Sequence, residues 1–160
     1  MTHDDDLTTI NNIIKSTRFA TVTTRTSTGD LVSRPLAVLG HEFEGTVWFF
    51  TQEPSPKTAD IAFDEHVNVT YIDGQNAVSL AGTATVSRDQ ARIDEFWNPF
   101  AGSWFEGGRT DPSVALLRVD ATSIEFWDID KPAIARAFEV VKGIITRSTP
   151  DVGENRTIQL

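Results

Sequence analysis

Cysteine is absent from the sequence of 160 residues. This absence excludes disulfide bonds, thiolate nucleophiles and zinc sites built on cysteine. The sequence also lacks any apolar run that approaches the ~18 residues of a membrane-spanning helix. The first residues, MTHDDDLTTINNIIK, have neither the basic segment nor the continuous apolar segment of a signal peptide. We therefore expect a cytoplasmic protein that does not bind membranes.

Positive charge is scarce. The chain has 14 Lys and Arg residues against 23 Asp and Glu residues, and its formal net charge is -9. Such a chain lacks the broad cationic surface on which nucleic-acid binding depends. We therefore expect no nucleic-acid partner, and any anionic ligand must be bound by a few local cations.

Metal-binding and hydrolytic motifs are missing as well. The three histidines, His3, His41 and His66, lie far apart in the sequence and do not have the spacing of metal ligands. No HExxH or GxSxG element occurs. Gly107 and Gly108 lack the preceding strand and the following helix of a dinucleotide-binding loop. We expect no metal site.

The sequence does contain a series of short segments rich in β-branched and aromatic residues, separated by turn-forming residues. This pattern, in a chain of single-domain length, predicts one mainly β domain over residues 1–160, an antiparallel barrel with peripheral helices. We expect strands over 18–25, 31–39, 46–51, 66–72, 77–87, 113–121 and 123–128, the last two as a hairpin. We expect a short amphipathic first helix, in which Leu7, Ile10, Ile13 and Ile14 recur at helical spacing, and further helices over 55–63, 88–97 and 132–143.

Two of the expected helices carry signals at their N-termini. Ser55 is a good N-cap, and Pro56 suits the first helical position. Ser87 with Gln90 fits a capping box that opens the helix over 88–97. The segment 98–112 is expected as a loop, and the residues after 143 as a C-terminal tail.

Arg34, Ser55 and Lys57 lie at the rims of apolar strands and offer the groups that bind phosphate: a guanidinium, a hydroxyl and an ammonium. A helix that begins at Ser55 would add backbone N–H donors. Pro35 places its strand at a sheet edge or a bulge, where the backbone can face a ligand. The alternative is that Ser55 only starts a helix while both cations are ordinary surface residues, and local pattern leaves both interpretations open.

Two groups of aromatic residues have a similar ambiguity. Trp48, Phe49 and Phe50 alternate between the two faces of a strand, so that some rings enter the core and others meet a subunit interface or a ligand. The segment from Trp97 to Pro112 is rich in aromatic residues and glycine. It is long for a connection, which favours a binding or lid role, although packing over the barrel end explains it equally well.

Taken in order, the segments ATVTT, SRPLAV, VWFFT, SPK, VSLAG, FWNP, WFEGG, DP and EFWD resemble the general stress protein 26-like branch of the pyridoxamine 5'-phosphate oxidase-related flavoproteins. The resemblance covers roughly residues 7–142, which we take as the domain core, with 143–160 as the tail. It implies a split β-barrel of the antiparallel Greek-key type. It also implies a homodimer that binds FMN in clefts at the subunit interface.

The same resemblance assigns cofactor-binding residues. It implies that the phosphate is held by Arg34, Ser55 and Lys57. It further implies that Ser33, Pro35 and Leu36 line the flavin, that Phe50 and Thr51 sit beside its ring or ribityl chain, and that Trp104 helps to close the cleft. No catalytic side chain is assigned, because the flavin carries the chemistry.

The chain also departs from the oxidases that this branch resembles. Pro56 stands where they place an arginine, and Leu39 stands where they place a substrate-binding lysine. Their C-terminal segment with arginine and histidine has no counterpart in ENRTIQL, and Glu106 replaces a proline that is frequent in this branch. These departures speak against vitamin B6 oxidation.

The resulting hypothesis is an FMN-dependent oxidoreductase with a role in stress and a small-molecule electron donor or acceptor. A second hypothesis is a flavin-binding module without turnover, which acts as a sensor, a store or a protective binder. A third keeps the barrel but exchanges FMN for FAD, deazaflavin F420 or haem.

Overall fold

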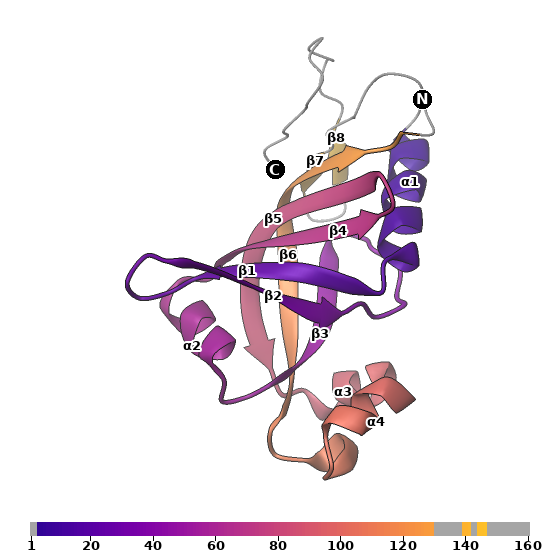
Figure 1. Ribbon diagram of the computed structural model, residues 1–160. Coiled ribbons are helices and arrows are strands. Elements are labelled where there is room, and N and C mark those ends of the chain that lie inside the picture. The colour runs from indigo at the N-terminus through magenta and orange to yellow at the C-terminus, as the bar shows by residue number, and fades with distance from the viewer. Residues whose placement is uncertain (1–2, 130–138, 142–143, 147–160) are drawn as a thin grey trace.

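The computed structural model describes residues 3–129, 139–141 and 144–146. Within these residues the chain is mainly β, with short helices around one large sheet (Figure 1). The strands are β1 (Phe19–Arg25), β2 (Leu31–Ala37), β3 (Thr46–Gln52), β4 (His66–Asp73), β5 (Asn76–Ser87), β6 (Val114–Trp127), β7 (Glu139–Val141) and β8 (Ile144–Thr146). The helices are α1 (His3–Ser16), α2 (Pro56–Phe63), α3 (Gln90–Phe96), α4 (Pro99–Trp104) and the 3-10 turn η1 (Gly108–Thr110).

The large sheet has six strands in the order β2-β1-β4-β5-β6-β3, and every neighbouring pair is antiparallel. Strand β3 follows β2 in sequence yet lies at the opposite edge of the sheet, because it pairs with β6. The sheet curls, so that these two edge strands approach each other (Figure 1). The fold is therefore a split β-barrel with peripheral helices, as the sequence predicted.

The main core lies inside the curled sheet. Strand β3 shows how the sequence fills it, since Val47 and Phe49 are buried there while the residues between them face the other side of the sheet. Helix α1 adds Ile10, Ile13 and Ile14 to the same core, which is the apolar stripe expected from their helical spacing. This helix lies beside β4 and β5, far from α3 and α4 (Figure 1).

The hairpin expected over 113–128 is wrong. The segment forms one continuous strand, β6, which pairs with β5 on one side and with β3 on the other. The interruption at Thr122 is a β-bulge: the β5–β6 register shifts between Ala81 and Gly82, and the Thr122 hydroxyl donates to the carbonyl of Ala81 at 3.2 Å. A bulge leaves one residue unpaired and bends the strand without reversing it.

The connection between β5 and β6 contains more structure than the expected loop over 98–112. Asn98 caps helix α4 by accepting a hydrogen bond from the Ala101 N–H at 2.8 Å, and Pro99 occupies its first turn. The preceding helix α3 is capped by Asp89, which accepts from the Ala91 N–H at 3.0 Å. The expected capping box of Ser87 with Gln90 is therefore wrong.

At the C-terminus, the helix expected over 132–143 is wrong for residues 139–141, which form β7 and pair with β8. The rest of that expected helix, and the tail beyond 146, lie outside the described residues. Among the residues that the structure describes, no helix is long and apolar enough to cross a membrane.

The bulge generates a test of the fold. A Cβ atom at Gly82 would lie 2.3 Å from the carbonyl oxygen of Asp120 on β6, a contact with backbone that neither strand can relieve cheaply. We expect Gly82→Ala to lower the free energy of unfolding by about 1–3 kcal/mol, measured by urea denaturation. Gly40→Ala is the matched control, because no heavy atom lies within 4 Å of its added Cβ. Equal stability of the two variants would contradict the close approach of β5 and β6.

Candidate functional site

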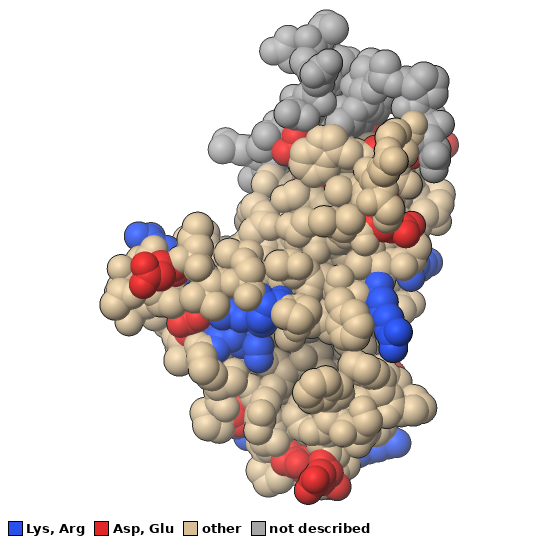
Figure 2. All heavy atoms as spheres, viewed as in Figure 1, with Lys and Arg blue, Asp and Glu red and all other residues tan. Residues whose placement is uncertain are grey.

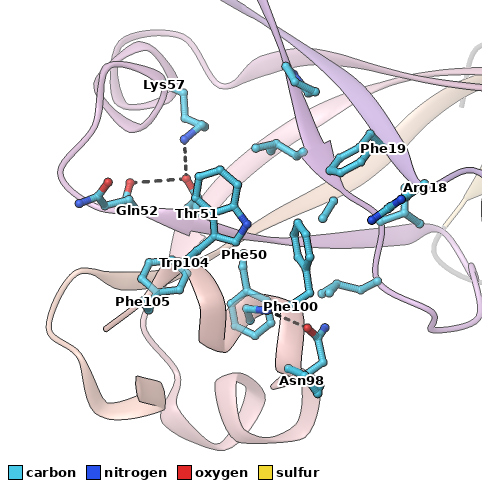
Figure 3. Close-up of a pocket in the computed structure, with 17 residues that line it drawn as sticks. Arg18, Phe19, Phe50, Thr51, Gln52, Lys57, Asn98, Phe100, Trp104 and Phe105 are labelled. Atoms are coloured by element: carbon cyan, nitrogen blue, oxygen red, sulfur yellow. Dashed lines mark hydrogen bonds between the residues drawn. The ribbon is translucent and has the colours of Figure 1, made fainter. Parts of the chain in front are cut away.

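A cavity of about 640 Å³ lies between β2, β3 and the start of α2 on one side and α4 on the other. Figure 3 shows its lining, in which Lys57 and Thr51 lie at one end and Arg18 and Phe19 at the other. Most of the lining is apolar or aromatic, and its volume is within the usual range for small-molecule sites. No Asp or Glu is among the lining residues.

Six of the nine cofactor-binding residues expected from the sequence line this cavity: Pro35, Leu36, Phe50, Thr51, Lys57 and Trp104. The other three, Ser33, Arg34 and Ser55, do not belong to its lining. Thus the structure brings the expected residues of β2, β3, α2 and α4 to one place, although the phosphate-binding trio is not brought together as a set of lining residues.

Lys57 is one of the two cations that line the cavity, and Arg18 is the other. The Lys57 ammonium donates a hydrogen bond to the Thr51 hydroxyl at 2.8 Å (Figure 3). Burial lowers the pKa of Lys57, and repulsion from the Arg34 guanidinium lowers it further. Lys57 has no carboxylate partner among the described residues. An anion beside this ammonium would relieve both penalties.

Arg34 is held just behind this position. Its guanidinium donates to the Thr24 hydroxyl at 2.6 Å and lies 3.5 Å from a carboxylate oxygen of Asp60 on α2. The Thr24 hydroxyl also donates to Asp60 at 2.9 Å. Figure 2 shows Lys and Arg side chains gathered between the β1–β2 hairpin and α2, the elements that carry Arg34 and Lys57. Asp60 and Thr24 therefore fix the guanidinium in place and neutralise part of its charge.

Ser55 serves the start of α2. Its hydroxyl accepts from the Thr58 N–H at 3.4 Å, and the Thr58 hydroxyl accepts in turn from the Ser55 N–H at 3.0 Å. This capping box uses two of the backbone donors that the sequence left free for an anion. Pro56 at the first helical position has no N–H to offer.

The other expected residues of β2 do not all reach the cavity: Pro35 and Leu36 line it, and Ser33 does not. Strand β2 is an edge strand, which confirms the position inferred from Pro35. Ser33 is exposed, and its hydroxyl lies 2.7 Å from that of Thr23 on β1. Its place in a cofactor site is not supported by the cavity lining, since only Pro35 and residues after it reach that lining.

The aromatic residues of β3 separate as the alternation predicts. Phe49 is in the main core, while Trp48 and Phe50 face the opposite side and pack against a smaller cluster under α3 and α4. The Phe50 ring meets Trp97 edge to face, with the ring centroids 5.6 Å apart. Trp104 differs from these rings because 71% of it is exposed, at the cavity. Trp97 is thus accounted for by packing against its neighbours, whereas Trp104 is free to contact a ligand.

Sequence reasoning missed several lining residues, and Arg18 and Phe19 are the most informative. Arg18 stands just before β1, and its guanidinium lies over the Phe19 ring at 5.5 Å from the centroid. Phe19 meets Phe100 of α4 at 6.1 Å. No local pattern marks these residues, because their proximity to α4 depends on the curl of the sheet. The described residues contain no group of His, Cys, Asp or Glu side chains that could hold a metal ion.

Comparison with known proteins places the chain in a family. A family profile described as "Pyridoxamine 5'-phosphate oxidase like" matches residues 5–151. This protein therefore belongs to the pyridoxamine 5'-phosphate oxidase-like family, which confirms the resemblance drawn from the sequence motifs.

Individual relatives agree with this assignment. Protein bli-3 of Neurospora crassa is 29% identical over 167 residues, which cover 97% of this chain and 80% of that protein. A Clostridium acetobutylicum protein related to general stress protein 26 of B. subtilis has a TM-score of 0.74 and 17% identity, with 88% of this chain and 97% of that chain covered. The general stress FMN/FAD binding protein of Xanthomonas citri has a TM-score of 0.68 and 24% identity, with 93% of this chain and 99% of that chain covered.

Lys57 and Arg34 differ in their surroundings, because only Arg34 lies near a carboxylate, and this difference predicts opposite effects on stability. Lys57→Met removes a half-buried ammonium that has no carboxylate partner, so the ligand-free protein should become more stable at neutral pH. Because the pKa of Lys57 is lowered in the folded state, the penalty exists only where the lysine is protonated. The advantage of Lys57→Met should therefore shrink as the pH rises through that lowered pKa toward the ordinary lysine value.

Arg34→Met should have the opposite effect. It removes the hydrogen bond to Thr24 and leaves the largely buried Asp60 carboxylate without its cation, so we expect a loss of about 1–3 kcal/mol. Urea denaturation of both variants between neutral and alkaline pH measures the two effects. If Lys57→Met destabilises the protein as much as Arg34→Met does, the claim that the Lys57 ammonium has no stabilising partner is wrong.

Proposed function

We propose that this protein is a flavoprotein that binds FMN in the cavity between β2, β3 and α4 and acts as an oxidoreductase. The observation that carries the proposal is the position of Lys57. It is a half-buried cation beside Arg34, without a carboxylate partner among the described residues, at one end of a mostly apolar and aromatic cavity. A phosphate is the kind of group that such a pair of cations binds, and a flat heterocycle suits the remaining surface.

The residues present fit the two halves of FMN differently. At the phosphate end, Lys57 and Arg34 supply positive charge and Thr51 supplies a hydroxyl. Ser55 and Thr58 hydrogen-bond to each other in the capping box, so those backbone donors are not free for a phosphate. At the ring end, apolar contact comes from Pro35, Leu36, Phe50 and Trp104. The fit is therefore good for a single phosphate and a planar ring, with fewer backbone donors than the sequence suggested.

When bound, the flavin supplies hydride or electron transfer. The chain's own residues would anchor the phosphate, hold the ring against β2 and β3, and exclude water with the aromatic rings of α4. Among the residues that line the cavity, only Arg18 and Lys57 are titratable, so no lining carboxylate or histidine offers itself as a general acid or base.

The relatives support a flavin but leave its form open, since the Xanthomonas citri protein is named for FMN and FAD together. We favour FMN because Lys57, with Arg34 behind it, offers positive charge for one terminal phosphate at that end of the cavity. FAD, deazaflavin F420 and haem remain the alternatives, although no histidine lines the cavity to bind haem iron. Leu39, at the position of the oxidases' substrate lysine, also lines the cavity, so we do not propose vitamin B6 oxidation.

We also propose a cytoplasmic homodimer with the cofactor sites at the subunit interface and a role in stress. The support for dimerisation is the exposed aromatic surface beside the cavity, where Phe19 is 45%, Phe100 39% and Trp104 71% exposed. Surfaces of this kind are typical of protein interfaces. The names of the general stress relatives support the stress role.

The first test is the identity of the ligand. The absorbance spectrum of the purified protein, with the mass of any ligand released by denaturation, should identify FMN, and fluorescence quenching should give the affinity of added FMN. Lys57→Ala and Arg34→Ala should each weaken binding by about 1.5–3 kcal/mol, or roughly ten- to a hundredfold. Binding should depend only modestly on salt, because few cations contact the ligand.

Arg109→Ala is the matched control for both variants. Arg109 also has no carboxylate partner among the described residues, yet it lies in η1 and does not line the cavity. Its loss should leave FMN affinity unchanged. Absence of FMN binding to the wild-type protein would refute the proposed function. Unchanged FMN affinity in both site variants would show that Arg34 and Lys57 do not bind the phosphate.

The proposed dimer has its own measurement. Light scattering coupled to size-exclusion chromatography should give about twice the chain mass of 17.7 kDa. Trp104→Ala should shift the protein toward the monomer at low concentration, because it removes the most exposed large ring of the cavity rim. A monomeric wild-type protein that still binds FMN would contradict the dimer and leave the cofactor proposal intact.

A second candidate function is a flavin binder without turnover. The observation that favours it is that no carboxylate or histidine belongs to the cavity lining. Photoreduced, FMN-loaded protein should be mixed with oxygen, quinones and nitroaromatic compounds. Rapid, saturable reoxidation by one of them supports the oxidoreductase, and slow, unsaturable reoxidation by all of them supports the passive binder.

A further inference from the structure

Most of the Lys and Arg side chains that the structure describes lie near a carboxylate. Among the residues that the structure describes, six Lys or Arg side chains have a carboxylate oxygen within 4.0 Å: Lys15, Arg25, Arg34, Arg88, Arg92 and Arg118. The described cations without such a partner are Arg18, Lys57 and Arg109, and two of these three line the large cavity. The cavity therefore concentrates uncompensated positive charge in a chain of net charge -9.

The two cavity cations lie at opposite ends. Figure 3 shows Lys57 beside Thr51 at one end and Arg18 beside Phe19 at the other, with Phe50 and Trp104 between them. A phosphate held near Lys57 therefore leaves the Arg18 guanidinium without an anion.

Arg18 is well placed to bind a ligand because its backbone is fixed while its side chain is exposed. Its carbonyl accepts from the Val38 N–H at 3.1 Å, and the preceding Thr17 is buried with its hydroxyl donating to Ile13 at 2.8 Å. The guanidinium lies over the Phe19 ring, a contact that orients it without using its N–H donors. Those donors remain available for a planar acceptor such as a carboxylate.

Aromatic rings continue from this cation along the cavity rim. Phe19 meets Phe100 at 6.1 Å, and Phe100 meets Trp104 at 6.2 Å between ring centroids. All three rings are more than a third exposed on the single chain, so they are available to contact a ligand that is bound between the proposed subunits. The rim thus offers three aromatic rings inclined to one another, beside a guanidinium that has no carboxylate partner among the described residues.

We propose that Arg18 and Phe19 form a second anion-binding subsite of the cavity, which receives a planar aromatic molecule carrying a carboxylate. This inference names the substrate class of the proposed flavoprotein and rests on that function. The guanidinium binds the carboxylate, and Phe19, Phe100 and Trp104 contact the ring. The local cation is needed because the net negative charge of the chain repels such an anion at long range.

A separate molecule is favoured over part of the cofactor because Arg18 lies at the end of the cavity opposite Lys57, where the phosphate of the proposed FMN is held. If Arg18 instead served the flavin, its removal would change the absorbance spectrum or the reduction potential of FMN-loaded protein in the absence of any second ligand. If it served a subunit contact, its removal would weaken the dimer. Both outcomes are therefore measured in the test below.

The test uses benzoate and its uncharged analogue benzamide as probes. Each is titrated into the full-length protein by calorimetry, with and without FMN. Wild-type protein should bind benzoate at least about fivefold more tightly than benzamide, because a guanidinium–carboxylate pair forms only with benzoate. Arg18→Gln should abolish that preference and leave benzamide binding unchanged.

Arg109→Gln is the control, since it removes the same charge from outside the cavity and should keep the preference. Lys57→Gln should weaken FMN binding and keep the benzoate preference, which separates the two subsites. The inference is overturned by equal binding of both probes to the wild type, by retention of the preference in Arg18→Gln, or by the spectral or dimer effects described above. A benzoate preference that depends on Arg18 in a protein that binds no FMN would refute the proposed function alone.

Discussion

The architecture depends on the double pairing of strand β6. This one strand hydrogen-bonds to β5 along one side and to β3 along the other, and so carries β3 to the sheet edge opposite β2. The bulge opposite Gly82 bends it, and β-bulges of this kind increase local twist. Because the sheet then curls, β2 and β3 approach each other. The cavity lies where these two edge strands meet α4.

The electrostatics of the site follow from this arrangement. Arg34 belongs to β2 and Lys57 to α2, yet folding brings them close enough that the guanidinium lowers the pKa of the ammonium. Asp60 and Thr24 anchor Arg34, whereas Lys57 has only a hydroxyl beside it. We expect the ammonium of Lys57 to lower the stability of the ligand-free protein, and such a cost is a common feature of binding sites. The same logic extends to Arg18, whose guanidinium also lacks a carboxylate.

Sequence reasoning predicted the family, the split barrel and six of the residues that line the cavity. It succeeded where the signal is local, as in the start of α2 at Pro56 or the alternation of Trp48, Phe49 and Phe50 on β3. It failed at Thr122, because a bulge and a turn interrupt an alternating pattern in the same way. It also missed α4, a helix of only six residues whose Asn98 cap and Pro99 resemble loop residues.

The sequence by itself determined the class of the protein, because ordered motifs and binary patterning along the chain are properties of residue order. It also determined that any anion must be met locally, since net charge is a matter of composition. Only the tertiary structure decided which cations remain unpaired, because pairing depends on side chains distant in sequence. Asp60 forms an ion pair with Arg34, and Glu53 forms one with Arg88. Lys57 and Arg18 have no such partner among the described residues and line the same cavity at opposite ends.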